Sequence, residues 1–382
     1  MRGHIRKRGR NSWEIKFEVE RTGGQRQTRY KSFKGTRRKA KDELARLLVQ
    51  VADGGHVNPS KVTVAEYLRE RLEVWRAMGT VSAKPAERYS QLIENQIALF
   101  IGTAPLQRLT TKEVEAWHAK LLIEGRHDKT GGVSTRTVRD AHRILFKALD
   151  EAVRHKLVPQ NVCALQPARK VVSQEMRILT PEQVAGFAAL LDGHEFAAAA
   201  LTALFTGMRR GEVLGLDWGN VDLEAKLIKV RKSLEETDEE GLQFKLPKTK
   251  ASIRDITLPR IVVETLQAHR KRLLERRIQL GLGKLGDSDL VFPDWEGSPQ
   301  WPDRFSARWS ELSQELKLGV SFHELRHTHA SQLIDAGVDV VTISKRLGHA
   351  SPTITLSTYA HLFRKDDSKA AAAINAALGA SS

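Results

Sequence analysis

The chain of 382 residues is long enough for two or three domains, and its 41% hydrophobic and 28% charged residues are typical of a folded globular protein. No apolar run approaches the ~20 residues of a membrane-spanning helix, and the basic start lacks the apolar core of a secretory signal. Cys163 is the only cysteine, which excludes an intrachain disulfide and a cysteine-based zinc site and favours a reducing cytoplasm.

The formal net charge of +16 is concentrated near the N-terminus, where residues 1–50 hold 16 Lys or Arg and 5 Asp or Glu. Such a basic block attracts the phosphates of nucleic acid, because binding releases condensed counterions. A solubilising tail or a membrane-surface segment is the alternative. The block also carries a folding pattern that a simple tail would lack, which favours nucleic acid.

Residues 13–19 alternate apolar and charged side chains, which predicts a half-buried strand. A Gly-Gly turn at 23–24 should connect it to a second strand over residues 29–33. An amphipathic pattern at residues 40–51, followed by another Gly pair, predicts a helix. We therefore expect a small β-β-α domain over residues 1–56, with exposed basic side chains.

Residues 62–162 show helical periodicity throughout, which predicts an all-α unit. Four helices are expected, beginning near Val64, Tyr89, Thr110 and Ser134. The third should open on a capping box, in which Thr110 and Glu113 satisfy each other's backbone amides. Residues 57–61 and the segment around Pro159 and Pro167 are interpreted as linkers.

Residues 174–382 mix helices and short strands. Thr180 followed by Pro181 is a typical helix start. Beyond it we expect an Ala-rich helix at 195–206, strands at 227–230, 242–246 and 253–258, an acidic hairpin tip at 235–241, further helices, and a last Ala-rich helix at 369–378.

Three short segments of this part concentrate unusual polar residues. In the first, residues 206–212, a glycine interrupts two apolar helical stretches and places Arg209 in a turn near the core. An arginine so placed usually meets a carboxylate or a phosphate, because it keeps its charge. A pair between Arg209 and Glu212 that merely holds two helices is the alternative.

The second segment places His323, Arg326 and His327 on one face of a helix. Its literal His-Glu-x-x-His string also allows a zinc site, although an arginine inside such a site would repel the metal. In the third segment, His349 and Tyr359 lie ten residues apart. A buried tyrosine and a surface histidine without a shared function are the alternative there.

Taken in order, Arg209, a hairpin lysine, His323-x-x-Arg326, the Leu-Gly-His at 347–349 and Tyr359 resemble the signature of the tyrosine recombinases, also called the phage integrase family. The string 247–252 is similar to the family's lysine turn, with Lys248 as the expected catalytic lysine and Lys250 as its rival. The resemblance is specific over residues 175–365. It extends more loosely to the core-binding domain and to the arm-binding domain of lambda-type integrases.

This resemblance implies a multidomain α+β fold. An arm-binding domain with a three-stranded sheet and a helix would span residues 1–56, and a four-helix, SAM-like core-binding domain would span 62–162. A mainly α catalytic domain with a small antiparallel sheet would follow at 174–382. The implied catalytic residues are Arg209, Lys248, His323, Arg326, His349 and Tyr359.

The implied reaction is cleavage and rejoining of DNA through a 3′-phosphotyrosine, without ATP, cofactor or metal. Arg209 and Arg326 should bind the non-bridging phosphate oxygens as planar forks. His323 should accept the proton of Tyr359 or donate to the phosphate, and His349 should hydrogen-bond a phosphate oxygen. The hairpin lysine should protonate the leaving 5′ oxygen.

The implied partners are double-stranded DNA at core-type and arm-type sites, three further copies of the chain in a tetramer, and DNA-bending or excision-directing accessory proteins. Residues 370–378 would then dock on a neighbouring subunit, or else on their own. The expected setting is the cytoplasm of a bacterial host, without membrane attachment. Alternatives to an integrase are a chromosome or plasmid resolvase of the same family and a DNA-binding relative that has lost catalysis.

Overall fold

The computed structural model of the chain describes residues 3–20, 26–52, 60–128, 130–166, 176–247, 249–363 and 374–375. The chain divides into two compact units, residues 1–173 and residues 174–382, and each is described on its own. No helix in the described ranges is both long enough and apolar enough to cross a bilayer. The further division of the first unit into two domains stays a prediction.

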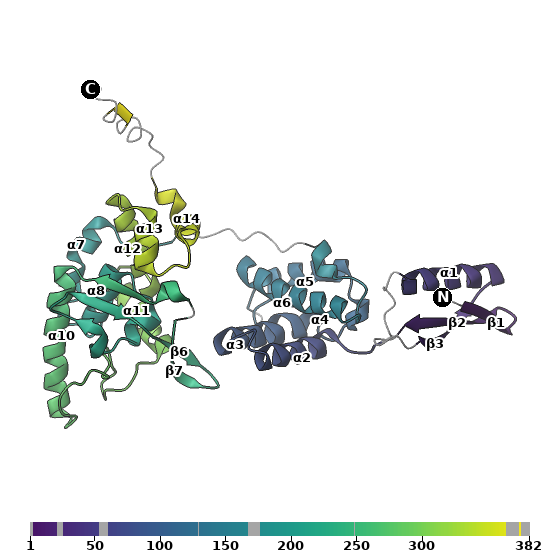
Figure 1. Cartoon of the computed structure of the whole chain (residues 1–382), viewed down its shortest axis with the longest axis horizontal. Coiled ribbons are helices and arrows are strands. Elements are labelled where there is room, and N and C mark those ends of the chain that lie inside the picture. The colour runs from purple at the N-terminus through teal and green to yellow at the C-terminus, as the bar shows by residue number, and fades with distance from the viewer. Residues whose placement is uncertain are drawn as a thin grey trace. The chain divides into compact units, whose positions relative to one another are not determined.

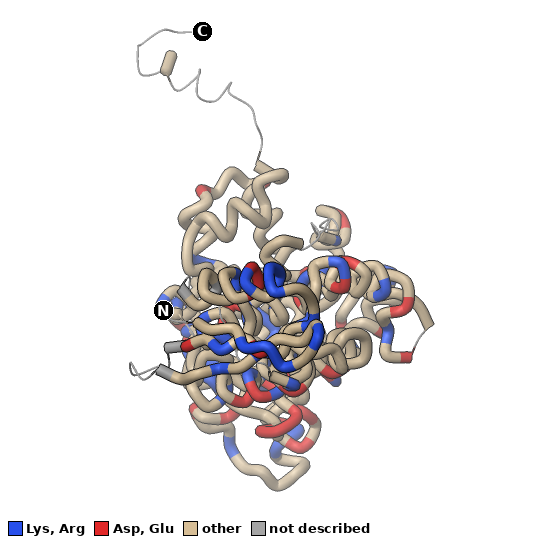
Figure 2. The backbone as a smooth tube through the Cα atoms, turned by 90° about the vertical axis from the view of Figure 1, so that its right-hand side faces the viewer, with Lys and Arg blue, Asp and Glu red and all other residues tan. Residues whose placement is uncertain are grey.

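The first unit begins with an antiparallel sheet of strand order β1-β2-β3, which a helix follows (Figure 1). The elements are β1 (Gly3–Gly9), β2 (Ser12–Glu20), β3 (Arg26–Lys34) and α1 (Arg37–Ala52). Ile15 and Phe17 of β2 pack with Leu47 and Val51 of α1 in a small core, as the alternation indicated. Lys and Arg residues occur in all four elements and are drawn in blue in Figure 2.

Strand β1 carries no alternating pattern, because Ile5 is the only bulky apolar residue among its seven residues, and only the family resemblance implied a third strand. The strand pairs along β2, from Gly3 opposite Phe17 to Gly9 opposite Ser12. The expected turn at residues 23–24 and most of the expected linker at 57–61 lie outside the described residues.

Four main helices build the rest of the first unit, as predicted: α2 (Val64–Ala77), α3 (Ala83–Leu92), α5 (Thr111–Glu124) and α6 (Thr135–Arg154). The predicted second helix continues from α3 through a π-helical stretch, Ile93–Ala98, into the short α4 (Leu99–Ile101). Thr110 and Glu113 form the expected capping box, and Ser134 caps α6. Their core contains Leu68, Trp75, Ile97, Trp117 and Leu145.

The second unit is mainly helical. Its helices are α7 (Pro181–Leu190), α8 (Ala197–Thr206), α9 (Arg210–Leu214), α10 (Arg260–Gln279), α11 (Pro302–Glu315), α12 (Phe322–Asp335), α13 (Val340–Leu347) and α14 (Pro352–Tyr359). Thr180 and Pro181 open α7 as expected. Of the predicted last helix at 369–378, only residues 374–375 are described.

Two small antiparallel sheets complete the second unit. One has the order β4-β5-β8 and the other is the hairpin β6-β7. Their strands are β4 (Val221–Asp222), β5 (Leu227–Val230), β6 (Ser233–Thr237), β7 (Gly241–Lys245) and β8 (Arg254–Thr257). The predicted hairpin tip at 235–241 was too long, because residues 235–237 belong to β6. Their acidic side chains concealed a strand whose Leu234 and Thr237 are buried.

The Ala-rich α8 is the centre of the second unit and packs against α10 and α12 (Figure 1). Nine of its ten residues are buried, and their small side chains let neighbouring helices approach closely. Phe196, Phe305, Trp309 and Phe322 form an edge-to-face aromatic cluster beside it. This packing fixes the C-terminal end of α8 against α12, the two places from which the candidate site is built.

Candidate active site

The candidate site begins where α8 ends. Gly207 closes that helix in the left-handed conformation, at φ +69°, and Arg209 precedes α9. A Cβ atom on Gly207 would lie 2.7 Å from the His329 ring and 2.8 Å from Leu347, so a side chain has no room there. Arg209 thereby lies in the turn between α8 and α9, as the sequence predicted.

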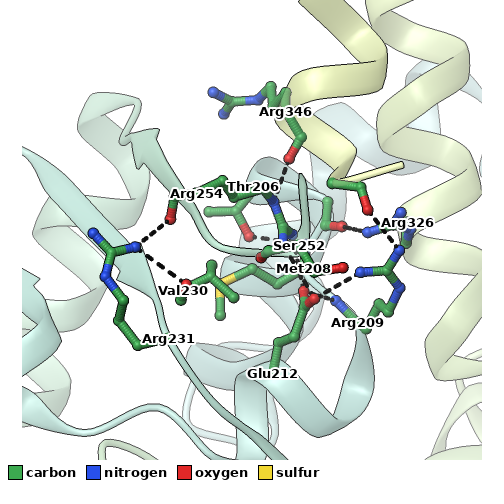
Figure 3. Close-up of polar contacts among 12 residues, drawn as sticks. Thr206, Met208, Arg209, Glu212, Val230, Arg231, Ser252, Arg254, Arg326 and Arg346 are labelled. Carbon is green, nitrogen blue, oxygen red and sulfur yellow. Dashed lines mark hydrogen bonds and ion pairs between the residues drawn. The ribbon is translucent and has the colours of Figure 1, made fainter. Parts of the chain in front are cut away.

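Arg209 is held by Glu212 and by a main-chain carbonyl (Figure 3). Its Nη1 donates to Glu212 Oε1 at 2.8 Å, its backbone N–H donates to Glu212 Oε2 at 2.9 Å, and Nη2 donates to the Gly348 carbonyl at 3.0 Å. The ion pair offered as a purely structural alternative is therefore present. Arg209 nonetheless keeps 36% of its side chain exposed, so it remains available to a ligand.

Glu212 also pairs with Arg254, a residue that the sequence analysis did not select (Figure 3). Both side chains are buried, and two hydrogen bonds of 3.1 and 2.8 Å join them. Burial alone would raise the pKa of Glu212, but the hydrogen bond and charge of Arg254, then the charge of Arg209, hold it below its ordinary value. The carboxylate is thus charged and shared between two guanidinium groups.

Arg254 also contacts two further segments. Its Nε donates to the Arg346 carbonyl at the end of α13 at 2.7 Å, and its Nη1 donates to the Ser252 carbonyl at 3.1 Å. The signal that could have identified it is the inward register of β8, in which Arg254 and Ile256 are buried and their neighbours are exposed. An arginine at a core-facing strand position requires a buried partner.

Helix α12 supplies three site residues from one face. Ser321 and Glu324 form the capping box that starts the helix, and His323, Arg326 and His327 follow. The guanidinium of Arg326 is 3% exposed and its Nη1 donates to the Gly207 carbonyl at 2.6 Å. Burial, followed by repulsion from Arg209, lowers the pKa of Arg326 to about 9. Because burial and the charge of Arg209 both disfavour the charged guanidinium, binding of an anion beside Arg326 would stabilise it.

Helices α13 and α14 supply the last two predicted residues. His349 follows Gly348, which ends α13 at φ +70°, and its Nδ1 lies 2.8 Å from the Thr355 hydroxyl. Tyr359 ends α14 with a ring only 1% exposed, and its hydroxyl lies 2.6 Å from Nδ1 of His327. Burial raises the pKa of Tyr359 to about 12, against the opposing charge of Arg326.

One pocket of about 390 Å³ brings five of the six predicted catalytic residues together. They are Arg209, His323, Arg326, His349 and Tyr359. Lys248 lies outside the described residues, whereas Thr249 and Ser252, which follow it in the chain, line the pocket. Lys250 is exposed on the same turn. A larger hollow of about 780 Å³, beside α10, contains none of these residues.

The charges of this pocket suit an anion with several oxygens. Burial, then the neighbouring His327 and Arg326, lowers the pKa of His323 to about 4, and burial with Arg326 does the same to His349. Both imidazoles are therefore neutral at pH 7, while the two guanidinium groups stay charged. Neutral rings offer one donor and one acceptor each, beside fixed positive charge, as a phosphodiester requires.

The zinc alternative finds less support in the geometry. The rings of His323 and His327 lie 5.0 Å apart and perpendicular, but Nδ1 of His327 is engaged with Tyr359, and Glu324 caps its own helix. Across the described ranges, no group of three or more His, Cys, Asp or Glu side chains could hold a metal ion.

Comparison with known proteins bears on the family to which the chain belongs. A model of the phage integrase family matches residues 177–366. The chain is 26% identical to a tyrosine recombinase XerC-like protein of Caldanaerobacter subterraneus subsp. tengcongensis, over 97% of each chain. It is also 26% identical to the ICEBs1 integrase of Bacillus subtilis, over 76% of this chain and 78% of that one.

The fold is similar to that of two solved integrases. The Tn1549 transposon integrase in complex with a circular intermediate DNA gives a TM-score of 0.67 at 19% identity, covering 83% of this chain and 99% of that one. A lambda integrase tetramer bound to a Holliday junction gives 0.55 at 19% identity, covering 91% and 96%. The chain belongs to the phage integrase family, whose members are the tyrosine recombinases.

Proposed function

We propose that this protein is a site-specific recombinase that integrates and excises a phage or mobile element, with Tyr359 as the nucleophile. One observation carries the assignment of the nucleophile. Tyr359 lines a single pocket together with Arg209, Arg326, His323 and His349. No other tyrosine of the described chain lines this pocket.

The reaction begins with attack of the Tyr359 oxygen on a DNA phosphate. As the new P–O bond forms, negative charge grows on the non-bridging oxygens, and the fixed cations Arg209 and Arg326 stabilise it. His349 and His323 donate further hydrogen bonds to the same oxygens. Lys248, or Lys250 on the same turn, protonates the 5′ oxygen as it leaves.

The product is a 3′-phosphotyrosine and a free 5′ hydroxyl. Because one phosphodiester bond is exchanged for another, the energy of the broken bond is conserved in the enzyme–DNA link. Attack by a second strand's 5′ hydroxyl then reverses the step and releases Tyr359. The cycle therefore needs no ATP.

Double-stranded DNA is the proposed substrate, and a tetramer on two DNA sites is the proposed assembly. The DNA-bound Tn1549 and lambda integrases support this proposal by their folds. The basic sheet and helix within residues 3–52 would bind a second, distant site, which raises the effective concentration of the catalytic unit at the first. This basic part favours an integrase over a simple resolvase. The presence of the expected arginine, histidine and tyrosine side chains in one pocket argues against a relative that has lost catalysis.

A nicked suicide substrate tests the proposal. Cleavage beside the nick releases a short oligonucleotide, so the protein becomes trapped on DNA as a covalent adduct. We expect Tyr359→Phe to abolish the adduct and to leave DNA binding unchanged, as measured by denaturing gel and by mobility shift. Tyr67→Phe is the matched control, because that hydroxyl is buried in the helical part of the first unit. An adduct formed by Tyr359→Phe would show that another residue is the nucleophile.

A further inference from the structure

The hydroxyl of Tyr359 contacts His327, which is not the histidine that the sequence pattern favoured. Nδ1 of His327 lies 2.6 Å from the phenolic oxygen, and the two ring centroids lie 5.7 Å apart at 59°. His323 lies one helical turn earlier on α12 and meets the edge of the His327 ring instead. In the pocket, His327 therefore stands between His323 and the nucleophile.

The direction of this hydrogen bond follows from the burial of the phenol. Tyr359 is 1% exposed, and Nδ1 of His327 is the only hydrogen-bond partner of its hydroxyl within the described residues. If Nδ1 donated, the phenolic proton would be buried without an acceptor, at a cost of about 1–3 kcal/mol. The stable arrangement is therefore the tautomer in which Tyr359 donates and Nδ1 accepts.

The charge state of His327 suits a proton acceptor. Burial, then the positive charge of Arg326, lowers its pKa, against the weaker opposing effect of Glu324. The ring is therefore neutral near pH 7, and the lone pair of Nδ1 that accepts from Tyr359 can also accept its proton. The charged or titratable groups that face it are Glu324 and Arg326 on its own helix, His323 one turn before, Arg209 and His349 across the pocket, and Tyr359.

We propose that His327 is a catalytic residue whose Nδ1 takes the phenolic proton as Tyr359 attacks the phosphate. The inference rests on the proposed recombinase function. In the forward step the O–H bond of Tyr359 breaks, its proton moves to Nδ1, and the phenolic oxygen bonds to phosphorus. The bond from phosphorus to the 5′ oxygen breaks, and that oxygen takes its proton from the hairpin lysine. In the rejoining step, His327 returns the proton to Tyr359.

This assignment leaves His323 free to contact the phosphate. Protonation of His327 also places a second positive charge beside Arg326 while the phosphate gains negative charge, so the transferred proton assists the same transition state. The proposal divides the two histidines of α12 by role: one serves the nucleophile and the other serves the phosphate.

The decisive variant is His327→Asn, whose amide can occupy the place of Nδ1 without accepting a proton. We expect its adduct formation on the nicked substrate to fall between about 10²-fold and 10⁴-fold, the usual contribution of a general base, with DNA binding unchanged. His361→Gln is the matched control, because that histidine is exposed and lies two residues after the nucleophile. If His327→Asn misfolds and fails to bind DNA, His327→Gln serves instead.

A chemical rescue separates proton transfer from positioning. Fluorinated tyrosine at position 359 has a more acidic phenol, so it should restore most of the rate lost in His327→Asn. It should not restore the rate lost in His323→Gln, because that change removes a phosphate contact. Loss of less than about threefold in His327→Asn, or equal rescue of both variants, overturns the role of His327. Adduct formation by Tyr359→Phe would instead overturn the proposed function itself.

Discussion

At the scale of single residues, the site depends on one buried carboxylate shared by two arginines. Glu212 orients Arg209 toward the pocket, and Arg254 supplies the second positive charge that keeps Glu212 ionised. Arg254 itself does not line the pocket. Its contacts with Ser252 and with the Arg346 carbonyl nevertheless join the lysine turn and the end of α13 to the same carboxylate. It is therefore a positioning residue for three parts of the site.

This arrangement predicts that Arg254→Met strongly lowers the free energy of unfolding. The change leaves Glu212 buried beside one partially exposed arginine, and breaking a buried pair in this way costs about 3–5 kcal/mol. Arg231→Met is the matched control, since its ion pair with Asp255 joins side chains that are 37% and 46% exposed and should be worth less than about 1 kcal/mol. Urea denaturation of the two variants measures the difference. Equal losses would show that the buried network adds nothing beyond a surface pair.

At the scale of elements, two left-handed glycines make the frame of the site. The Gly207 carbonyl accepts from Arg326, and the Gly348 carbonyl accepts from Arg209. Each guanidinium is thus held by the end of a helix other than its own. The helix ends at α8 and α13 therefore set the distance between the two cations.

At this scale we predict that Gly207→Ala destabilises the protein by more than the backbone strain of a left-handed alanine alone. A Cβ in the left-handed region costs about 1–2 kcal/mol, and overpacking against His329 and Leu347 adds about 1–3 kcal/mol. Gly193→Ala is the control, because Gly193 has a similar φ of +73° with no atom within 4 Å of the new Cβ. The midpoint temperature of thermal unfolding and the rate of adduct formation should both be lower in Gly207→Ala than in Gly193→Ala. Indistinguishable variants would mean that the turn at Gly207 relaxes freely.

Some of these elements could be predicted from the sequence and others could not. The capping box at Thr110, the helix start at Thr180 and the strand at 227–230 were predicted correctly, because they depend on near neighbours in the chain. The residue pattern alone missed strands β1 and β6, since their basic or acidic side chains hide the few apolar residues that pack, and only the family resemblance implied a third strand in the first sheet.

The site divides in the same way. The order of its residues along the chain revealed the family, but the pairing of His327 with Tyr359 joins residues 32 apart. The pairing of Glu212 with Arg254 joins residues 42 apart. The first contact joins α12 to α14 and the second joins α9 to β8, and no local sequence pattern encodes such pairs. From the sequence, His327 was considered only as part of a helix face and as a ligand in the zinc alternative. No role was predicted for Arg254.

At the scale of the whole molecule, the fold keeps many imidazoles uncharged. Burial is the largest cause of a lowered pKa for six histidines in the described ranges: His142, His269, His323, His327, His329 and His349. Five of these belong to the second unit. In the proposed recombinase, neutral rings near Arg209 and Arg326 avoid further repulsion between cations before a DNA phosphate arrives.

The consequence is a second unit that acid destabilises. A histidine whose pKa is lower in the folded chain takes up its proton first in the unfolded chain. Stability is therefore complete above the unfolded value of ~6.5. It declines as the pH falls toward the folded values, which are about 4 for His323 and about 3 for His329. Each such histidine contributes a slope of at most ~1.4 kcal/mol per pH unit within that window.

We expect the free energy of unfolding, measured with urea, to fall steadily between pH 7 and pH 5. His329 should account for a part of this pH dependence that is separate from the pocket. Its side chain is 5% exposed, contacts Gly207 and does not line the pocket. His329→Gln should therefore reduce the pH slope by about one proton. DNA should protect His323 and His349, because a phosphate between them raises their pKa values, but it should not protect His329. A slope that DNA abolishes completely would place the acid-sensitive groups in the pocket alone.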